Sequence, residues 1–229
     1  MQSEISSKNQ TIEPYTLKVL ITADGSPTLL NNTLNESYHS RHGAKQESMH
    51  VFIQAGLMQL HNDFINVLEI GFGTGLNATL TALHKETRTI HYTALEPFPV
   101  ALELLEKLKY FSASGDISIH QEIIQADFDT VTSIGSQFHL KKLKTKIQDL
   151  DTEEKYNLVY FDAFAPMIQP EMWTQEIFEQ LFSMMDVKGV LVTYCAKGEV
   201  RRNMIAAGFS VERIAGPPGK REMLRAKKL

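Results

Sequence analysis

The sequence predicts an α/β fold built on a mainly parallel sheet, and the first of three observations behind this prediction is a strand–turn–helix pattern. Residues 67–70 are mostly apolar and prone to β structure, as in a strand buried on both faces. Gly71, Gly73 and Gly75 follow at every second position, and residues 76–83 resume with a helical pattern. Because glycines at such a turn adopt positive φ and let backbone pass close to a ligand, the turn is predicted to cradle a nucleotide.

The second observation is that strand-like segments recur along the chain with helical or polar connections between them, which is typical of a parallel sheet. The further core strands are predicted at 89–95, 138–147, 157–161 and 187–194. The connections with helical character are 100–110, 120–128, 171–185 and 199–207.

The third observation is a predicted hairpin at the end of the chain. Residues 209–214 and 222–228 are predicted to pair as two antiparallel strands, joined through a Gly-Pro-Pro-Gly turn at 216–219. The expected architecture is therefore a Rossmann-like, mainly parallel sheet of seven strands with an antiparallel hairpin at its C-terminal end.

A small N-terminal extension is expected to precede this domain, with residues 1–48 in the extension and residues 49–229 in the Rossmann-like domain. Residues 15–22 alternate enough for a short strand, and a turn follows at 23–28. The polar stretch 34–48 lacks an apolar stripe and is predicted to wall the binding site. An amphipathic helix is expected over 48–61.

Composition narrows the class of protein. The chain has 229 residues, 43% hydrophobic content and a net charge of −4. No apolar run approaches the length that spans a bilayer, the polar N-terminus lacks a signal-peptide core, and Cys195 is the only cysteine. We therefore expect a cytoplasmic protein without a disulfide and without membrane association.

The charge is unevenly distributed. Residues 188–229 contain ten Lys or Arg against three Glu, which gives this end of the chain about +7. A basic end on an acidic protein is a weak indication of a polyanionic partner. On charge alone, an ordinary solvated surface explains it equally well.

Acidic residues near the predicted strand ends indicate the kind of ligand. Glu69 lies two residues before Gly71, where a carboxylate would repel a pyrophosphate and suit a cationic or amine-bearing ligand. Glu96 follows the 89–95 strand, where an acid accepts hydrogen bonds from ribose hydroxyls. The G-x-G-x-G spacing differs from the dinucleotide fingerprint. The pattern resembles the first motif of class I S-adenosylmethionine-dependent methyltransferases.

Two further features concern the chemistry of the site. Asp162 follows the 157–161 strand, at the sheet edge where open α/β folds place ligands and catalytic groups. Its alternative role is to cap the loop that follows. His39, His42 and His50 have no carboxylate or cysteine at a matching interval, so no metal site is expected.

Longer motifs resemble one family more closely. The sequence is similar to the methyltransferase domain of the bacterial tRNA 5-methylaminomethyl-2-thiouridine biosynthesis proteins, the MnmC type, which stands alone as MnmD. Coverage runs from about residue 15 to the C-terminus. The motifs that carry the resemblance are Tyr38-His39-Ser40, Glu69-Ile70-Gly71-Phe72-Gly73, Asp162-Ala163-Phe164-Ala165-Pro166, Pro170-Glu171-Met172-Trp173, and Gly219-Lys220-Arg221-Glu222-Met223.

The resemblance implies a reaction. A methyl group would pass from S-adenosylmethionine to the exocyclic amine of 5-aminomethyl-2-thiouridine at the wobble position of tRNA, giving the 5-methylaminomethyl form. The partner would be the anticodon stem-loop of tRNA. The chain has no room for the flavin-dependent oxidase domain of the bifunctional members, so that activity, or another that forms the aminomethyl group, is expected on a separate protein.

The resemblance also implies roles for residues. Asp162 would orient the amine, accept its proton and contact the cofactor. The other expected cofactor residues are Tyr38, Ser40, Glu47, Glu69, Gly71, Gly73, Gly75, Asn77, Glu96 and Asp149. The candidate phosphate contacts are Lys197, Arg201, Arg202, Lys220 and Arg221. Family members tend to have an acid just after the third strand, where this chain has Lys146, so Asp149 or Asp127 is expected to contact the adenine instead.

Other functions compete with this one. A related methyltransferase could act on a small amine or on a protein, although the basic C-terminal region mildly disfavours that. A non-catalytic module that binds S-adenosylmethionine or RNA is disfavoured by the set Glu69, Glu96 and Asp162. A nicotinamide-dependent oxidoreductase is disfavoured by the glycine spacing.

Overall fold

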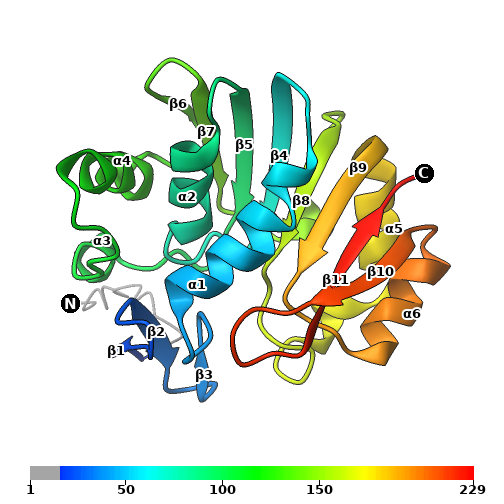
Figure 1. The fold of residues 1–229 in the computed structure, drawn as a ribbon, viewed down its shortest axis with the longest axis horizontal. Helices are drawn as coiled ribbons and strands as arrows, with labels where there is room; N and C mark the ends of the chain where they lie inside the picture. The colour runs from blue at the N-terminus through cyan, green and yellow to red at the C-terminus, as the bar shows by residue number, and fades with distance from the viewer. Residues whose placement is uncertain (1–15) are drawn as a thin grey trace, which may run out of the picture.

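A central sheet of eight strands organises the computed structural model, which describes residues 16–229; residues 1–15 of the predicted extension lie outside the described part (Figure 1). The strand order is β10-β11-β9-β8-β4-β5-β7-β6. The strands are β4 (Phe64–Ile70), β5 (Thr89–Leu95), β6 (Val131–Ile134), β7 (Phe138–Leu143), β8 (Tyr156–Phe161), β9 (Met185–Thr193), β10 (Ser210–Ala215) and β11 (Glu222–Lys227).

The middle of the sheet is parallel. Strands β9, β8, β4, β5 and β7 pair in parallel, whereas β11 pairs antiparallel with both β9 and β10. Because parallel strands end at the same edge, residues that follow β4, β5 and β8 meet there. The register confirms this, since Ile70 lies opposite both Leu95 and Phe161.

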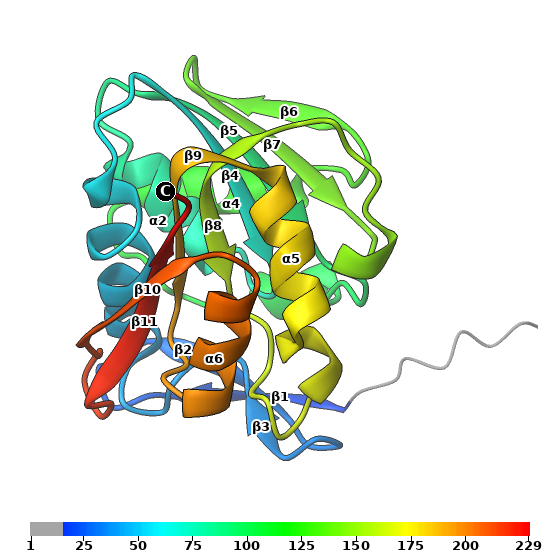
Figure 2. The same ribbon diagram turned by 90° about the vertical axis from the view of Figure 1, so that its right-hand side faces the viewer.

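Helices cover both faces of the sheet, as the side view shows (Figure 2). One face carries α1 (Ala44–Ser48), the π-helical segment η1 (Met49–Gln54), α2 (Leu76–His84) and α4 (Ser114–Gln125). The other face carries α5 (Gln175–Met184) and α6 (Gly198–Ala206). The remaining short elements are α3 (Leu102–Leu105) and the 3₁₀ turns η2 (Leu57–Gln59), η3 (Ile147–Asp149) and η4 (Pro170–Trp173).

Each face has its own apolar core. Phe52, Leu76 and Ile123 belong to the cluster on the α2 side, and Trp173 and Phe178 belong to the cluster on the α5 side, all of them buried. The strands between the two clusters are apolar on both faces, which is why β4 and β8 read as nearly continuous hydrophobic runs. In the part of the chain that the structure describes, no helix is long and apolar enough to cross a membrane.

The N-terminal strands form a separate small sheet. Strands β1 (Leu17–Ile21), β2 (Pro27–Asn31) and β3 (Glu36–Ser37) pair antiparallel in that order. This sheet lies beside the edge of the central sheet at which the parallel strands end (Figure 1). The chain from β3 into α1 therefore passes over the glycine turn, and Tyr38 lies within contact distance of Gly73.

The structure departs from several sequence predictions. The helix predicted over 100–110 is reduced to α3 (Leu102–Leu105), and the one predicted over 120–128 is α4 (Ser114–Gln125), which begins earlier and ends earlier. The central sheet has eight strands instead of seven, because a tight turn at Gly135, with φ +64°, lets β6 pair with β7 as an antiparallel edge strand. The predicted 138–147 strand ends at Leu143, since its neighbour β5 ends at Leu95. The helix expected over 48–61 begins earlier, at Ala44, and its π-helical continuation ends at Gln54.

Candidate functional site

The site is built around the glycine turn between β4 and α2. Gly71 has φ +90°, and a Cβ atom there would lie 2.7 Å from the backbone oxygen of Asp162. Gly73 has φ +53°, and a Cβ atom there would lie 3.2 Å from the Tyr38 ring. Both positions therefore need glycine, for conformation and for space. Gly75 precedes α2 and packs against Phe72, behind the turn.

A network of three polar side chains lies at one end of this turn. Asn77, in the first turn of α2, donates from Nδ2 to Glu69 Oε1 at 3.0 Å and to Asp162 Oδ2 at 2.9 Å. Glu69 is fully buried in β4, whereas Asp162 follows β8 and is only partly buried. The amide thus ties two carboxyl groups from neighbouring strands together, and Asp162 presents the more accessible one.

Glu96 lies at the other end of the turn. The backbone N–H of Gly73 donates to its Oε2 at 2.9 Å, and that of Phe98 donates to its Oε1 at 3.0 Å. Both oxygens are thereby fixed in position, and each keeps further capacity to accept a hydrogen bond. A carboxyl group held in this way is suited to bind a pair of adjacent hydroxyl groups.

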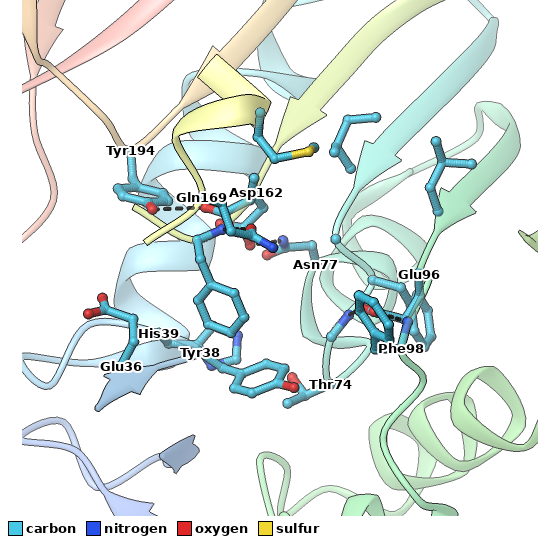
Figure 3. A pocket seen from close by; sticks show the side chains of 18 of the residues that line it. Glu36, Tyr38, His39, Thr74, Asn77, Glu96, Phe98, Asp162, Gln169 and Tyr194 are labelled. Carbon is cyan, nitrogen blue, oxygen red and sulfur yellow. Dashed lines mark hydrogen bonds between the residues drawn. The ribbon is translucent and has the colours of Figure 1, made fainter. Parts of the chain in front are cut away.

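These residues open into a cavity of about 250 Å³. Asp162 and Asn77 lie on one side of it and Glu96 and Phe98 on the other (Figure 3). Aromatic rings supply much of the remaining wall, with Tyr38 and Phe164 in edge contact at 5.2 Å between centroids. The cavity therefore has carboxyl groups at both ends and an aromatic wall between them.

Burial alters the acidity of these carboxyl groups. Desolvation raises the pKa of Glu96 to about 7, although its two backbone N–H donors oppose the rise. Desolvation and the neighbouring Glu47 raise the pKa of Asp162 to about 7. Desolvation, with a contribution from Asp162, raises the pKa of Glu69 well above its usual value. Asp162 is thus suited to exchange a proton near neutral pH.

The structure brings many of the predicted site residues to one cavity. Those that line it are Tyr38, Ser40, Glu47, Gly71, Gly73, Asn77, Glu96, Asp162 and Lys220. Glu69 lies directly behind Asn77 and is not itself among the lining residues. The predicted chemical groups therefore converge from the N-terminal extension, the sheet edge and the C-terminal hairpin.

Other predicted residues lie elsewhere. Asp149 is exposed on η3 and Asp127 is exposed after α4, and neither is among the residues that line the cavity. Lys146 lines it instead, next to Ile147. The candidate phosphate contacts lie outside it: Lys197 immediately precedes α6, Arg201 and Arg202 are on α6, and Arg221 is on the β10–β11 loop.

Some lining residues carried no role in the sequence analysis. Tyr194, Gln169 and Phe98 all line the cavity, and the Tyr194 hydroxyl donates to the Ala163 backbone oxygen at 2.9 Å. Tyr194 and Phe98 lie at or just after predicted strands, whereas Gln169 lies in the loop between Pro166 and Pro170 and had no such signal. His39 also lines the cavity but is largely buried, with Nδ1 3.0 Å from Thr28 Oγ1, and desolvation lowers its pKa to about 4.

The residues present fit S-adenosylmethionine. The Oδ1 atom of Asn77 is buried beside the cavity without a partner in the described structure, and it could accept a hydrogen bond from an amino group. The Gly71 and Gly73 backbone leaves room for close approach, and Glu96 offers two fixed acceptors. The cavity wall thus offers a hydrogen-bond acceptor for the amine-bearing end of the cofactor, two acceptors for its ribose and aromatic rings for its base.

Comparisons with known proteins agree with this reading. Residues 117–229 match the model of a family described as S-adenosyl-L-methionine-dependent methyltransferase. The chain is 27% identical over 226 residues to the tRNA 5-methylaminomethyl-2-thiouridine biosynthesis bifunctional protein MnmC of Leptospira interrogans, covering 90% of this chain and 34% of that protein. It is 29% identical over 217 residues to the MnmC of Campylobacter hominis, covering 86% and 31%.

A solved structure extends the similarity to three dimensions. The crystal structure of MNMC2 from Aquifex aeolicus superposes with a TM-score of 0.77 at 26% identity, covering 94% of this chain and 72% of that one. The class I fold and the resemblance expected from the sequence are confirmed. The chain spans about a third of the length of the curated relatives it matches.

Proposed function

We propose that this chain, an S-adenosyl-L-methionine-dependent methyltransferase related to the MnmC proteins, N-methylates 5-aminomethyl-(2-thio)uridine at the wobble position of tRNA. The substrate assignment rests on the similarity, over about nine tenths of the chain, to proteins named for making the methylated nucleoside. The cavity supports it, because a carboxyl group that titrates near neutrality lies where an amine would be received.

The cofactor would lie along the glycine turn. Glu96 would accept hydrogen bonds from the ribose hydroxyls, and Asn77 with the carboxyl groups of Glu69 and Asp162 would bind the amine-bearing end. Lys146 and Phe98 would flank the base in place of a carboxylate. When bound, the cofactor supplies a methyl group already activated by a sulfonium.

The protein's contribution to the reaction is alignment and a proton acceptor. An alkylamine is mostly protonated near neutral pH and must be neutral to attack. Asp162 Oδ would accept the proton of the ammonium, directly or through water, so that the amine is neutral when it attacks the methyl group that the cofactor would supply. Asn77 fixes the Asp162 carboxylate for this step through its 2.9 Å hydrogen bond.

The RNA partner would approach the basic end of the chain. At the start of α6, on α6 and on the β10–β11 loop are cations that could contact phosphates of the anticodon stem-loop, namely Lys197, Arg201, Arg202 and Arg221. The target base would have to be splayed out to enter the cavity. We place the enzyme in the cytoplasm with its tRNA, and assign formation of the aminomethyl group to a separate protein.

The test is nucleoside mass spectrometry of tRNA that carries 5-aminomethyl-2-thiouridine, after incubation with the enzyme and S-adenosylmethionine. Loss of the aminomethyl nucleoside and gain of a species 14 mass units heavier (roughly one CH₂) is expected, and Asp162→Asn should slow this conversion by about 10²- to 10⁴-fold. Persistence of the unmethylated nucleoside would contradict the substrate. Normal turnover by the Asp162→Asn variant would contradict the mechanism.

The main alternative is a methyltransferase that acts on a small amine or a protein. The same incubation without tRNA, with radiolabelled cofactor and candidate amines or protein extract, separates the two. Label transferred only when tRNA is present supports the proposed substrate, and label in protein or in a small amine supports the alternative.

A further inference from the structure

Lys220 lies inside the cavity wall, although its sequence context predicted a phosphate contact. Its Nζ is 2.7 Å from Glu47 Oε1 and 3.9 Å from the centroid of the Tyr194 ring. Its side chain is 32% exposed, and that of Glu47 is 8% exposed. A lysine held by a nearly buried carboxylate and an aromatic face has little freedom to follow a phosphate.

Glu47 is fixed from a second side as well. The backbone N–H of Ser40 donates to Glu47 Oε2 at 2.7 Å, so both carboxylate oxygens are engaged. Glu47 comes from α1, Lys220 from the loop between β10 and β11, and Asp162 from the end of β8, and all three line the same cavity. The ion pair thus joins two distant parts of the chain in the wall of the cavity that also holds the proposed proton acceptor.

We propose that Lys220 is a positioning residue for methyl transfer, which holds Glu47 in the cavity wall and, together with it, sets the electrostatic environment of Asp162. The inference rests on the proposed function, in which Asp162 accepts the proton of the substrate amine. When Asp162, Glu47 and Lys220 are all ionised, the group carries one net negative charge, which complements the single positive charge of an incoming ammonium.

The charges around Asp162 support this role. Glu47 raises the pKa of Asp162 and Lys220 lowers it, while the Asn77 amide also favours the ionised form. Among the described residues, Asp162 also interacts with Glu69 in β4, Tyr92 in β5 and Tyr194 after β9. Two charged residues in the cavity wall therefore act on Asp162. They are the cation Lys220 and the anion Glu47, which form an ion pair with each other.

Removal of the Lys220 charge and removal of the Glu47 charge should shift the pKa of Asp162 in opposite directions. Without the Lys220 cation, Glu47 is left as an uncompensated anion, and Asp162 keeps its proton to higher pH. Without the Glu47 carboxylate, the cation is uncompensated, so Asp162 ionises at lower pH and becomes a weaker base. Removal of both restores a similar net charge around Asp162.

The experiment measures two quantities for Lys220→Met, Glu47→Gln and the double variant. One is the pH dependence of kcat/KM for methyl transfer to tRNA, and the other is the titration of the Asp162 carboxyl carbon by ¹³C NMR, assigned with Asp162→Asn. The midpoint pH of each of these two curves should rise by roughly one pH unit in Lys220→Met and fall in Glu47→Gln. The double variant should return close to the wild type.

Arg221→Met is the matched control. It removes the same charge from the same loop, but its side chain is exposed and does not line the cavity. It should leave the Asp162 midpoint in place. If Lys220 were instead a phosphate contact, Lys220→Met would raise KM for tRNA and flatten its salt dependence without moving either midpoint, and that result would overturn the inference.

The NMR titration needs no substrate, so it separates two kinds of failure. Midpoints that move as expected in a protein that does not methylate tRNA would leave the inference about Lys220 intact and refute only the proposed substrate. Methylation of tRNA with midpoints unchanged among the variants would refute the inference and leave the substrate intact.

Discussion

Glu96→Gln is the sharpest test of how the cavity binds its cofactor, because it changes one charge and almost no volume. In the wild type, both Glu96 oxygens accept backbone N–H groups, from Gly73 and from Phe98. A glutamine can accept only one of these hydrogen bonds, since its NH₂ group would face the other N–H. The substitution therefore removes the charge, one acceptor for the backbone and one acceptor for a ribose hydroxyl.

The expected loss follows from these contacts. Above pH 7, where Glu96 is mostly ionised, a hydrogen bond to a charged group contributes about 1.5–3 kcal/mol, so replacement of one such bond and weakening of the other should cost about 3 kcal/mol of binding free energy. Since 1.4 kcal/mol corresponds to about a factor of ten, the Kd for S-adenosylhomocysteine should rise by about 100-fold.

Calorimetric titration of both proteins with S-adenosylhomocysteine and with its 2′-deoxy and 3′-deoxy analogues measures this directly. The wild type should lose affinity for each deoxy analogue, and the variant should discriminate much less between them and the parent ligand. Thermal unfolding without ligand monitors the integrity of the variant. A Kd within about threefold of the wild type, or equal discrimination by both proteins, would refute the assignment of Glu96 to the ribose.

Three further predictions concern the acidity of Asp162, the backbone of the glycine turn and the contact of Arg202 with RNA. Because the pKa of Asp162 is about 7, its ionised fraction and kcat/KM should fall by about tenfold between pH 8 and pH 6; a flat pH–rate profile would exclude it as the proton acceptor. Gly71→Ala places a Cβ atom 2.7 Å from a backbone oxygen at φ +90°, so it should cost about 1–3 kcal/mol of unfolding free energy and weaken cofactor binding. Gly115→Ala in α4, where a Cβ meets nothing within 4 Å, should stabilise by about 0.5–1 kcal/mol in the same denaturant titration. Arg202→Gln should reduce the slope of log K against log salt for tRNA by about 0.7–0.9, whereas Lys107→Gln, far from α6, should leave the slope unchanged.

The same upward pKa shift makes stability depend on pH. The folded protein holds a proton on Asp162 up to about pH 7, whereas the unfolded chain releases it near the ordinary value for Asp. The stabilisation of the folded state that comes from this retained proton is therefore present at acidic pH and is lost as pH rises through about 7. Without ligand, Asp162→Asn should show less of this loss between pH 5 and pH 8 in thermal unfolding.

The sequence predicted the parts of the site that depend on short-range patterns. The glycine turn, Glu69 ahead of it and the acids after β5 and β8 all follow from strand periodicity and from where parallel strands end. The terminal hairpin could be predicted for the same reason, since its turn residues and its two strands are contiguous in sequence. The edge strand β6 was missed, because its four residues have no alternating pattern and end at a glycine turn.

The sequence could not predict contacts that depend on how distant segments fold together. Lys220 resembled a surface cation, and only the packing of the β10–β11 loop against α1 brings it to Glu47. Likewise, the position of Asp149 depended on where the third parallel strand ends. Because β7 stops at Leu143, the chain turns early, so Lys146 lines the cavity and Asp149 is exposed on η3.

The ion pair between Lys220 and Glu47 joins residues 173 positions apart. During synthesis, Glu47 therefore emerges from the ribosome long before Lys220 is translated. A growing polypeptide on the ribosome could thus fold its central strands while one wall of the cavity is still missing. The cavity would then be complete only after the β10–β11 loop has emerged and packed against α1.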